Sequence, residues 1–183
     1  MKLNMNGSQD PNYRYTIQGF DVNIAGKGNG IYTIINNIDA ISRGVNHPPE
    51  VIGKYIANIT GSNYNMEQHI LTGAHLSKEL NSIILEYIKY IVLCPKCNIP
   101  ETIPIMEGTK KNAEIKLSCS ACKNISPLKI NNSKIEKAVD IIIKYLKAGK
   151  EWVTNKGMMV KQELDNKQID NTENTEDTPF DDI

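Results

Sequence analysis

Two pairs of cysteines, each with the spacing Cys-x-x-Cys, constrain this chain more than any other feature. The first pair is Cys94 and Cys97, the second is Cys119 and Cys122, and together they are all four cysteines of the sequence. Each pair can form a tight knuckle that presents two thiolates on one side, so the pairs supply the four soft ligands of a tetrahedral structural zinc ion. The spacing predicts a four-cysteine zinc ribbon, with Zn²⁺ as cofactor and a long hairpin between the knuckles.

Two disulfides are the alternative use of these cysteines. Nothing ahead of Cys94 resembles a secretory signal, and cytosolic proteins keep such thiols reduced. A redox-active Cys-x-x-Cys has less support, because one reactive pair does not need a second pair at this distance. No apolar run approaches the ~20 residues of a membrane span. We therefore expect a cytoplasmic protein that does not enter a membrane.

Charged residues are divided unevenly along the chain, although the formal net charge is zero. Residues 1–93 carry seven basic and seven acidic side chains, residues 94–162 carry thirteen and six, and residues 163–183 carry one and eight. The basic segment favours an anionic partner, and the acidic tail favours solvation or a basic partner. A solvated helix face and a disordered tail that aids solubility explain the same pattern.

Apolar periodicity predicts an α+β fold, in which a small sheet with packed helices is joined to the four-cysteine ribbon and a C-terminal helix. Residues 20–24 and 31–35 have the pattern of two strands around a glycine-rich loop, which is typical of a β-hairpin. Further strands are expected within residues 51–59 and near residues 70–71. Helices are expected at residues 37–45, 74–90 and 133–148, the last begun by a capping box at Ser133 and Glu136 and stopped by Gly149.

These elements divide the chain into five consecutive parts. The segment around Trp152 is either a docking segment or a linker between the last helix and the acidic tail. The expected parts are an irregular amino-terminal arm (1–19), an α/β domain (20–92), the zinc ribbon (93–130), the C-terminal helix (131–149) and a linker with a disordered acidic tail (150–183).

The glycine-rich loop at residues 26–30 does not fit the known phosphate-binding motifs. A Walker loop needs Gly-Lys-Ser/Thr at the start of a helix, and a dinucleotide fingerprint needs a helix after its glycines, whereas a strand follows here. The loop offers Lys27, Asn29 and bare backbone amides, which suit contact with an RNA phosphate. A plain hairpin tip is the other interpretation.

The sequence offers no arrangement of catalytic residues. His47, His69 and His75 share no ligand spacing with the cysteines and are expected to be ordinary surface or half-buried residues. There is no nucleophile–base–acid pattern and no pair of carboxylates at a plausible loop. We therefore do not expect an enzyme with its own active site.

Four motifs identify a resemblance to a known family. They are Tyr13-Arg14-Tyr15, Gly26-Lys27-Gly28-Asn29-Gly30-Ile31, Asn46-His47-Pro48-Pro49 with Lys54-Tyr55, and Leu93-Cys94-Pro95-Lys96-Cys97 with Pro100-Glu101-Thr102. In order and spacing they resemble the amino-terminal domain of eukaryotic translation initiation factor 5 and, more distantly, the β subunit of initiation factor 2. The resemblance covers about residues 10–147 and implies a small α/β domain with a four-cysteine zinc ribbon.

The resemblance also implies a function and its residues. In factor 5 this domain stimulates GTP hydrolysis by initiation factor 2 during start-codon selection, so the expected partners are that factor with GTP and initiator tRNA, the small ribosomal subunit and other initiation factors. The protein would be a monomeric GTPase activator. The essential family arginine falls on Arg14, whose guanidinium can stabilise charge on a transferred phosphoryl group, and a supporting lysine falls on Lys54. Stacking of Arg14 between its tyrosines is the structural alternative.

The chain departs from the family pattern at two points. A second family lysine falls on Tyr32, and the chain ends before the helical-repeat domain that factor 5 carries. Lys27 and Asn29 are retained, so contact with the initiator tRNA or nearby ribosomal RNA is still expected. These departures favour an alternative function, in which a binding module competes with factor 5, or replaces the β subunit, without stimulating hydrolysis.

Overall fold

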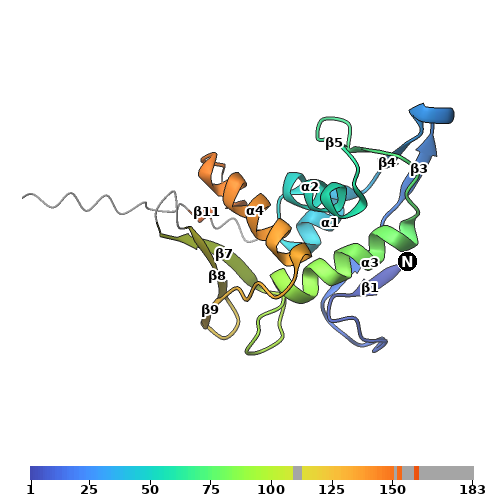
Figure 1. The fold of residues 1–183 in the computed structure, drawn as a ribbon. Helices are drawn as coiled ribbons and strands as arrows, with labels where there is room; N and C mark the ends of the chain where they lie inside the picture. Colours follow the sequence, from blue (N-terminus) through green and yellow to red (C-terminus); the bar gives the residue numbers. More distant parts are fainter. Residues whose placement is uncertain (109–112, 151, 154–158, 161–183) are drawn as a thin grey trace, which may run out of the picture.

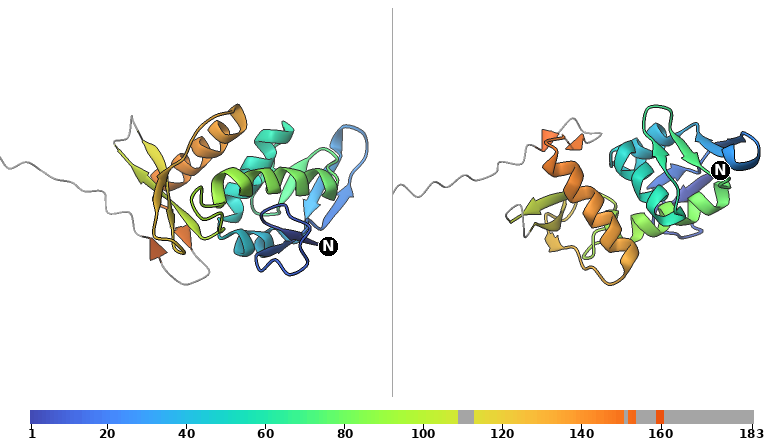
Figure 2. Two further views of the ribbon diagram at one scale, coloured as in Figure 1. Left: turned by 90° about the horizontal axis from the view of Figure 1, so that it is seen from below. Right: turned by 45° about the horizontal axis from the view of Figure 1, so that its top comes forward.

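The computed structural model describes residues 1–108, 113–150, 152–153 and 159–160. Strands from both ends of the described chain flank a central group of helices, so the predicted α+β class is confirmed. Figure 1 shows the glycine-rich tip at one end of the molecule and the ribbon at the other, and Figure 2 shows the same separation from two further directions.

The predicted β-hairpin forms one half of a four-stranded antiparallel sheet, with β3 at one edge. Strands β3 (Val22–Ala25) and β4 (Tyr32–Ile35) pair with each other, and β4 also pairs with β6 (Ile70–Thr72), which confirms the strand expected near residues 70–71. The order is β3-β4-β6-β5, with β5 (Tyr64–Asn65) at the other edge. A single turn of 3₁₀ helix, η1, closes the hairpin tip at Gly28–Gly30.

The amino-terminal arm contains two strands, so the prediction that residues 1–19 are irregular is wrong in that respect. Strands β1 (Lys2–Asn4) and β2 (Thr16–Gln18) pair in antiparallel fashion. Ile17 is buried, and its Cγ2 lies 2.8 Å from where a Cβ would stand on Gly44. Because only glycine leaves that space, helix α1 (Ile38–Val45) can lie close to β2.

The prediction of a strand within residues 51–59 is wrong, because this segment is helix α2 (Pro49–Thr60). Proline fits the first turn of a helix, where its missing N–H is not needed, and Gly61 ends the helix in a left-handed conformation with φ 68°. The large buried side chains of this segment recur at helical spacing, which is the period that the prediction misjudged. They are Val51, Ile52, Tyr55 and Ile56, and the small residues Gly53 and Ala57 are buried as well.

Helix α3 (Ser77–Tyr87) confirms the helix expected before the first cysteine pair. A π-helical turn, η2 (Ile88–Val92), continues it, and only Leu93 separates this turn from Cys94. The apolar side chains of this helix are buried or half-buried from Leu80 onward, whereas Leu76, which precedes the helix, is 65% exposed.

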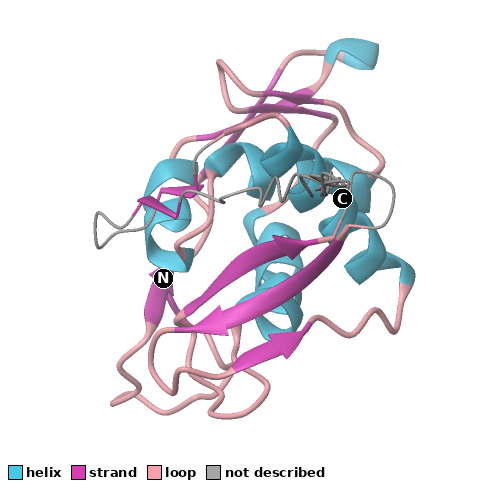
Figure 3. Cartoon of the chain, turned by 90° about the vertical axis from the view of Figure 1, so that its left-hand side faces the viewer, coloured by secondary structure: helices cyan, strands magenta, loops and turns pink. Residues whose placement is uncertain are grey.

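The ribbon is a three-stranded antiparallel sheet in the order β7-β8-β9, seen face-on in Figure 3. Helix α4 packs against α2 on one side and against β7 and β8 on the other. Asn132 rather than Ser133 caps α4, since its side-chain oxygen accepts the amide of Ile135 at 2.9 Å. Gly149, with φ 69°, follows its end as predicted. The bounds are β7 (Thr102–Glu107), β8 (Glu114–Cys119), β9 (Ile125–Pro127) and α4 (Ser133–Lys147).

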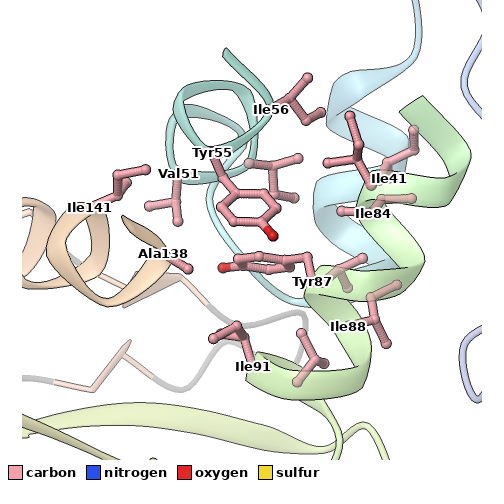
Figure 4. Close-up of a cluster of buried hydrophobic side chains, with 14 of the residues drawn as sticks. Ile41, Val51, Tyr55, Ile56, Ile84, Tyr87, Ile88, Ile91, Ala138 and Ile141 are labelled. Carbon is pink, nitrogen blue, oxygen red and sulfur yellow. The ribbon is translucent and has the colours of Figure 1, made fainter. Parts of the chain in front are cut away.

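One hydrophobic core joins the sheet, the helices and the ribbon. Figure 4 shows its centre, where Tyr55 of α2 and Tyr87 of α3 face Ala138 of α4. Ile115 of the ribbon and Trp152 of the short strand β10 belong to the same cluster. Strand β10 (Trp152–Val153) pairs with β11 (Met159–Val160). Among the described residues, no helix is both long enough and apolar enough to cross a membrane.

Candidate functional site

The four cysteine sulfur atoms converge at one end of the ribbon and lie within 4.8 Å of one another. Cys94 and Cys122 have their Sγ atoms 3.7 Å apart, and so do Cys97 and Cys119. Tetrahedral zinc–sulfur bonds of about 2.3 Å place sulfur atoms about 3.8 Å apart, whereas a disulfide needs about 2.0 Å. The cysteines are free thiols in an arrangement that could hold a metal ion.

The two knuckles have the same backbone geometry. In the first, Cys94 donates its amide to the Ile99 carbonyl and accepts the amide of Asn98 on its own carbonyl. Cys119 makes the equivalent bonds to Asn124 and Lys123 in the second. Asn98 and Lys123 both adopt a left-handed conformation, with φ of 57° and 59°. A run of only a few residues therefore determines each knuckle, which is why the sequence could predict it.

The pKa values of the cysteine thiols differ within the cluster. Burial opposes ionisation of Cys94, but amide hydrogen bonds from Cys97 and Lys96 lower the pKa of this thiol to about 7. At Cys97 the Ile99 amide favours the thiolate, yet burial and the neighbouring sulfur atoms raise the pKa to about 12. Four thiolates cannot all be charged side by side without compensation, and a bound metal dication supplies it.

Arg14 lies exposed on the arm between β1 and β2, and Tyr15 anchors it. The Arg14 Cζ stands 5.5 Å from the centre of the Tyr15 ring. The Tyr15 hydroxyl donates a hydrogen bond of 3.1 Å to Glu101 Oε1, next to the first knuckle. Burial, followed by this bond, raises the pKa of Tyr15, so the phenol stays protonated as a donor. Sequence reasoning placed Glu101 in a motif but did not find this contact across 86 positions.

Lys54 lies on the exposed side of α2, with its Nζ 2.6 Å from Glu50 Oε1. Glu50 also pairs with Lys150, which follows α4. Despite burial, the hydrogen bonds from Lys150 and Lys54 lower the pKa of Glu50. Lys150 still pairs with Glu50 when Lys54 moves away. Lys54 can therefore bind a partner with little loss of folding free energy.

The glycine-rich tip presents Lys27 and Asn29, both exposed. Beside it η1, β4 and β6 form an open hollow of about 720 Å³ that Asn29, Tyr32 and Gln68 help to line, with no charged residue in its wall. The tip and the ribbon lie at opposite ends of the molecule (Figure 1). Within the part of the chain that the structure describes, no hydrogen bond or ion pair joins Arg14, Lys54 and Lys27 to one another.

A second groove, of about 630 Å³, runs between the first knuckle and the segment after β9. Lys89, Lys96 and Lys129 line it together with Tyr90, and no acidic residue does. Lys89 Nζ stands 5.3 Å from the centre of the Tyr90 ring. Sequence reasoning found the basic block but not this groove, because its lysines come from separated segments.

Two histidines are buried, contrary to prediction. His47 is 1% exposed and shares a hydrogen bond of 2.7 Å with the Tyr87 hydroxyl. Burial lowers its pKa to about 3. Trp152 packs edge-on against His47 at 4.7 Å and donates its indole N–H to the Asn46 carbonyl. Trp152 itself therefore packs on the core, whereas most of the segment around it, and the predicted acidic tail, lie outside the described residues.

His75, the other buried histidine, lies between Ser62 and Glu79, an order that resembles a catalytic triad. Its Nε2 is 2.8 Å from Ser62 Oγ, and its Nδ1 is 3.5 Å from Glu79 Oε2. The same Nε2 is 3.0 Å from the Thr72 carbonyl, which can only accept a hydrogen bond. A proton on Nε2 suits the Thr72 carbonyl, and in that tautomer His75 cannot take a proton from Ser62 and instead ties the turn together.

Comparison with known proteins finds one family over most of the described chain. The matching family model is described as a domain found in initiation factors 2B and 5, and it matches residues 5–125. Eukaryotic translation initiation factor 5 of Caenorhabditis elegans is 37% identical over 127 residues, which are 67% of this chain and 28% of that protein. The factor of Mus musculus is 34% identical over 127 residues, which are 29% of that protein. The factor of Saccharomyces cerevisiae is 30% identical over 129 residues, which are 31% of that protein.

The chain thus spans less than a third of the length of these relatives. The matched residues include the arm with Arg14, the hairpin, the helices α1 to α3 and both cysteine pairs. The family match extends over more than half of the 183 residues. The chain therefore belongs to the family that shares the domain found in initiation factors 2B and 5.

Proposed function

We propose that this protein is a translation initiation factor that acts in start-codon selection by stimulating GTP hydrolysis by initiation factor 2 on the small ribosomal subunit. One observation carries the proposal. Arg14 is exposed, has no carboxylate partner among the described residues, and rests on the ring of Tyr15 in an arm that is itself paired and packed. A guanidinium held in this way is ready to meet an anionic centre on another molecule.

In this mechanism Arg14 acts in trans on the GTP of the partner. Its planar, permanently charged side chain stabilises the charge that spreads over the transferred γ-phosphoryl group, or holds the catalytic elements of the GTPase in place. Lys54, which can leave Glu50, supports that contact from α2. This protein contributes no nucleophile and binds no nucleotide of its own in this scheme.

The remaining surfaces serve binding. Lys27 and Asn29 at the tip contact the initiator tRNA or nearby ribosomal RNA, and the lysines of the second groove offer a further contact for phosphates. Cys94, Cys97, Cys119 and Cys122 would hold zinc, which supplies no reaction step and fixes the two knuckles against each other. Other initiation factors are further expected partners.

The test is single-turnover GTP hydrolysis in complexes of initiation factor 2, GTP and initiator tRNA on small subunits. Wild type should accelerate hydrolysis, and Arg14→Ala should lose most of that acceleration, within the ~10³–10⁵-fold range that arginine fingers supply. Arg14→Lys keeps the charge but not the planar fork and should recover little. Arg43→Ala, which changes the only other arginine, is the matched control for net charge. Equal acceleration by wild type and Arg14→Ala would refute the proposal.

A second candidate function rests on Tyr32, where the family resemblance places a lysine. The hollow beside Tyr32 has no charge in its wall, so the tip offers less attraction to phosphate than the resemblance implies. In this case the protein binds at the factor 5 site without stimulating hydrolysis. Wild type that displaces factor 5 and slows hydrolysis, together with a Tyr32→Lys variant that restores acceleration, would favour this function.

A further inference from the structure

We propose that Tyr15 is the positioning residue that couples the metal-binding ribbon to Arg14. The proposal rests on the function proposed above and adds to it how the arginine is placed. Tyr15 makes two contacts at once, because its ring lies beneath the Arg14 guanidinium and its hydroxyl donates to Glu101. One side chain thereby links the arm to a segment 86 positions further along the chain.

Glu101 is fixed to both cysteine pairs. It follows the first knuckle, and its backbone carbonyl accepts the amide of Ser120, within the second knuckle, at 2.8 Å. Thr102, the next residue, is 1% exposed and donates its hydroxyl to the Val92 carbonyl at 2.7 Å. The carboxylate that receives the Tyr15 hydroxyl is therefore placed by the knuckles that the metal holds together.

Among the side-chain hydrogen bonds that the structure describes near Arg14, only that of the Tyr15 hydroxyl reaches beyond the arm. Asp10 and Asn12 form hydrogen bonds only within the arm. The rings of Tyr13 and Tyr15 pack together with their centres 6.0 Å apart. On the other side of the arm, Met5 donates its amide to the Tyr15 carbonyl at 3.0 Å. Release of the Tyr15 hydroxyl therefore loosens the segment that carries Arg14, and the Met5 amide reports it.

Two test variants and two control variants separate loss of the Tyr15–Glu101 hydrogen bond from general damage to the fold. Tyr15→Phe removes the hydroxyl and keeps the ring under Arg14, and Glu101→Ala removes the acceptor but keeps the backbone carbonyl. Tyr13→Phe is the matched control, because no side-chain hydrogen bond of the described residues uses the Tyr13 hydroxyl. Glu114→Ala, on the exposed side of β8, is the control for a lost carboxylate.

The experiment measures hydrogen exchange of the Met5 amide in the full chain, with zinc bound and after removal by a chelator. With zinc, we expect exchange to be about three- to tenfold faster in Tyr15→Phe and Glu101→Ala than in wild type, and unchanged in both controls. Chelation should speed exchange in wild type but add little in Tyr15→Phe, because the path from metal to arm is already broken. Equal chelation effects in wild type and Tyr15→Phe, or no effect in either, would overturn the proposal.

GTP hydrolysis on small subunits supplies the functional measurement. At saturating protein, Tyr15→Phe should reduce the maximal stimulated rate several-fold and leave the half-saturating concentration unchanged, whereas Tyr13→Phe should keep the wild-type rate. If wild type gives no stimulation, the proposed function fails. The exchange measurement still decides whether the Tyr15–Glu101 hydrogen bond couples the ribbon to the arm. A stimulated rate that is the same in Tyr15→Phe and wild type would remove the positioning role.

Discussion

The four cysteines and the residues proposed to act on partners are organised in opposite ways. Four sulfur atoms from two short loops meet within 4.8 Å, and amides of the same loops stabilise them. Arg14, Lys54 and Lys27 lie instead on three different elements, exposed, without contact to one another. The four cysteines of the ribbon are already close enough together to hold a metal ion. The dispersed residues are parts of sites that only a partner surface can complete.

The difference shows what each region requires of the chain. The ligands of a metal site must be in place before any partner binds, because thiolates without a cation repel one another. A residue that acts on a partner must stay accessible. The fold can therefore hold its backbone in place but cannot bury the end of its side chain. Tyr15 meets both needs, because its hydroxyl is bound to Glu101 while Arg14 beyond it stays exposed.

The largest expected effect is loss of the metal. Cys119→Ser should abolish stoichiometric zinc binding and unfold the ribbon, because structural zinc contributes on the order of 10 kcal/mol of folding free energy. Metal content by mass spectrometry of the intact protein, with hydrogen exchange in β7 and β8, measures both changes. Ala121→Ser, in the same knuckle but not a ligand, is the control. Full zinc binding by Cys119→Ser would show that the four-sulfur cluster is not the metal site.

Truncation of Trp152 should be next in size. Trp152 is 1% exposed, so Trp152→Ala leaves a cavity and removes the indole N–H bond to the Asn46 carbonyl, and should lower the free energy of unfolding by about 3–5 kcal/mol. Urea denaturation measures the change. Leu76 is 65% exposed, so the control Leu76→Ala should change the free energy of unfolding by less than about 0.5 kcal/mol. A small loss in Trp152→Ala would mean that β10 does not belong to the core.

Acid should weaken the core through His47. Its pKa is about 3 in the folded protein, below the ordinary 6.5, so between these values the unfolded chain binds a proton that the folded chain does not. Stability is therefore unaffected by this group above pH 6.5 and falls as the pH drops toward 3, with a loss of roughly 3 kcal/mol by about pH 4.

Denaturation of wild type and His47→Gln at several pH values isolates this contribution, because metal loss in acid affects both proteins alike. The variant should be less stable at pH 7, and the difference should shrink as the pH falls below about 6.5. Parallel curves for wild type and His47→Gln would show that His47 is not the group responsible.

The smallest expected effect on stability is at Lys54. Lys54 is exposed and Lys150 also pairs with Glu50, so Lys54→Gln should change the free energy of unfolding by less than about 0.5 kcal/mol. Stimulated GTP hydrolysis should nevertheless fall several-fold. Lys78→Gln, on α3, is a control for the lost charge. A variant that loses stability instead of stimulation would place Lys54 among structural residues.

Local chemistry made part of the fold predictable. Several elements depend on spacings of a few residues, so the sequence predicts them. They are the two knuckles, the β3–β4 hairpin and helices α1, α3 and α4. The prediction fails at α2 because its apolar run also suits a strand, and because Pro48-Pro49 both stops α1 and starts the next helix. The predicted cap of α4 lies one residue late, since Asn132 and Ser133 are both residue types that favour this position.

By itself the sequence determined the four-sulfur ligand set, most of the helical and strand periods and the family motifs, because each is written within short segments. Only the tertiary structure decided that Trp152 binds Asn46 and covers His47, that Lys150 shares Glu50 with Lys54, and that Tyr15 binds Glu101. The hydrogen bonds of these three contacts join residues that are 86 to 106 positions apart, and they form only when the whole core has placed both partners. Packing of the entire chain, rather than any local preference, selects them.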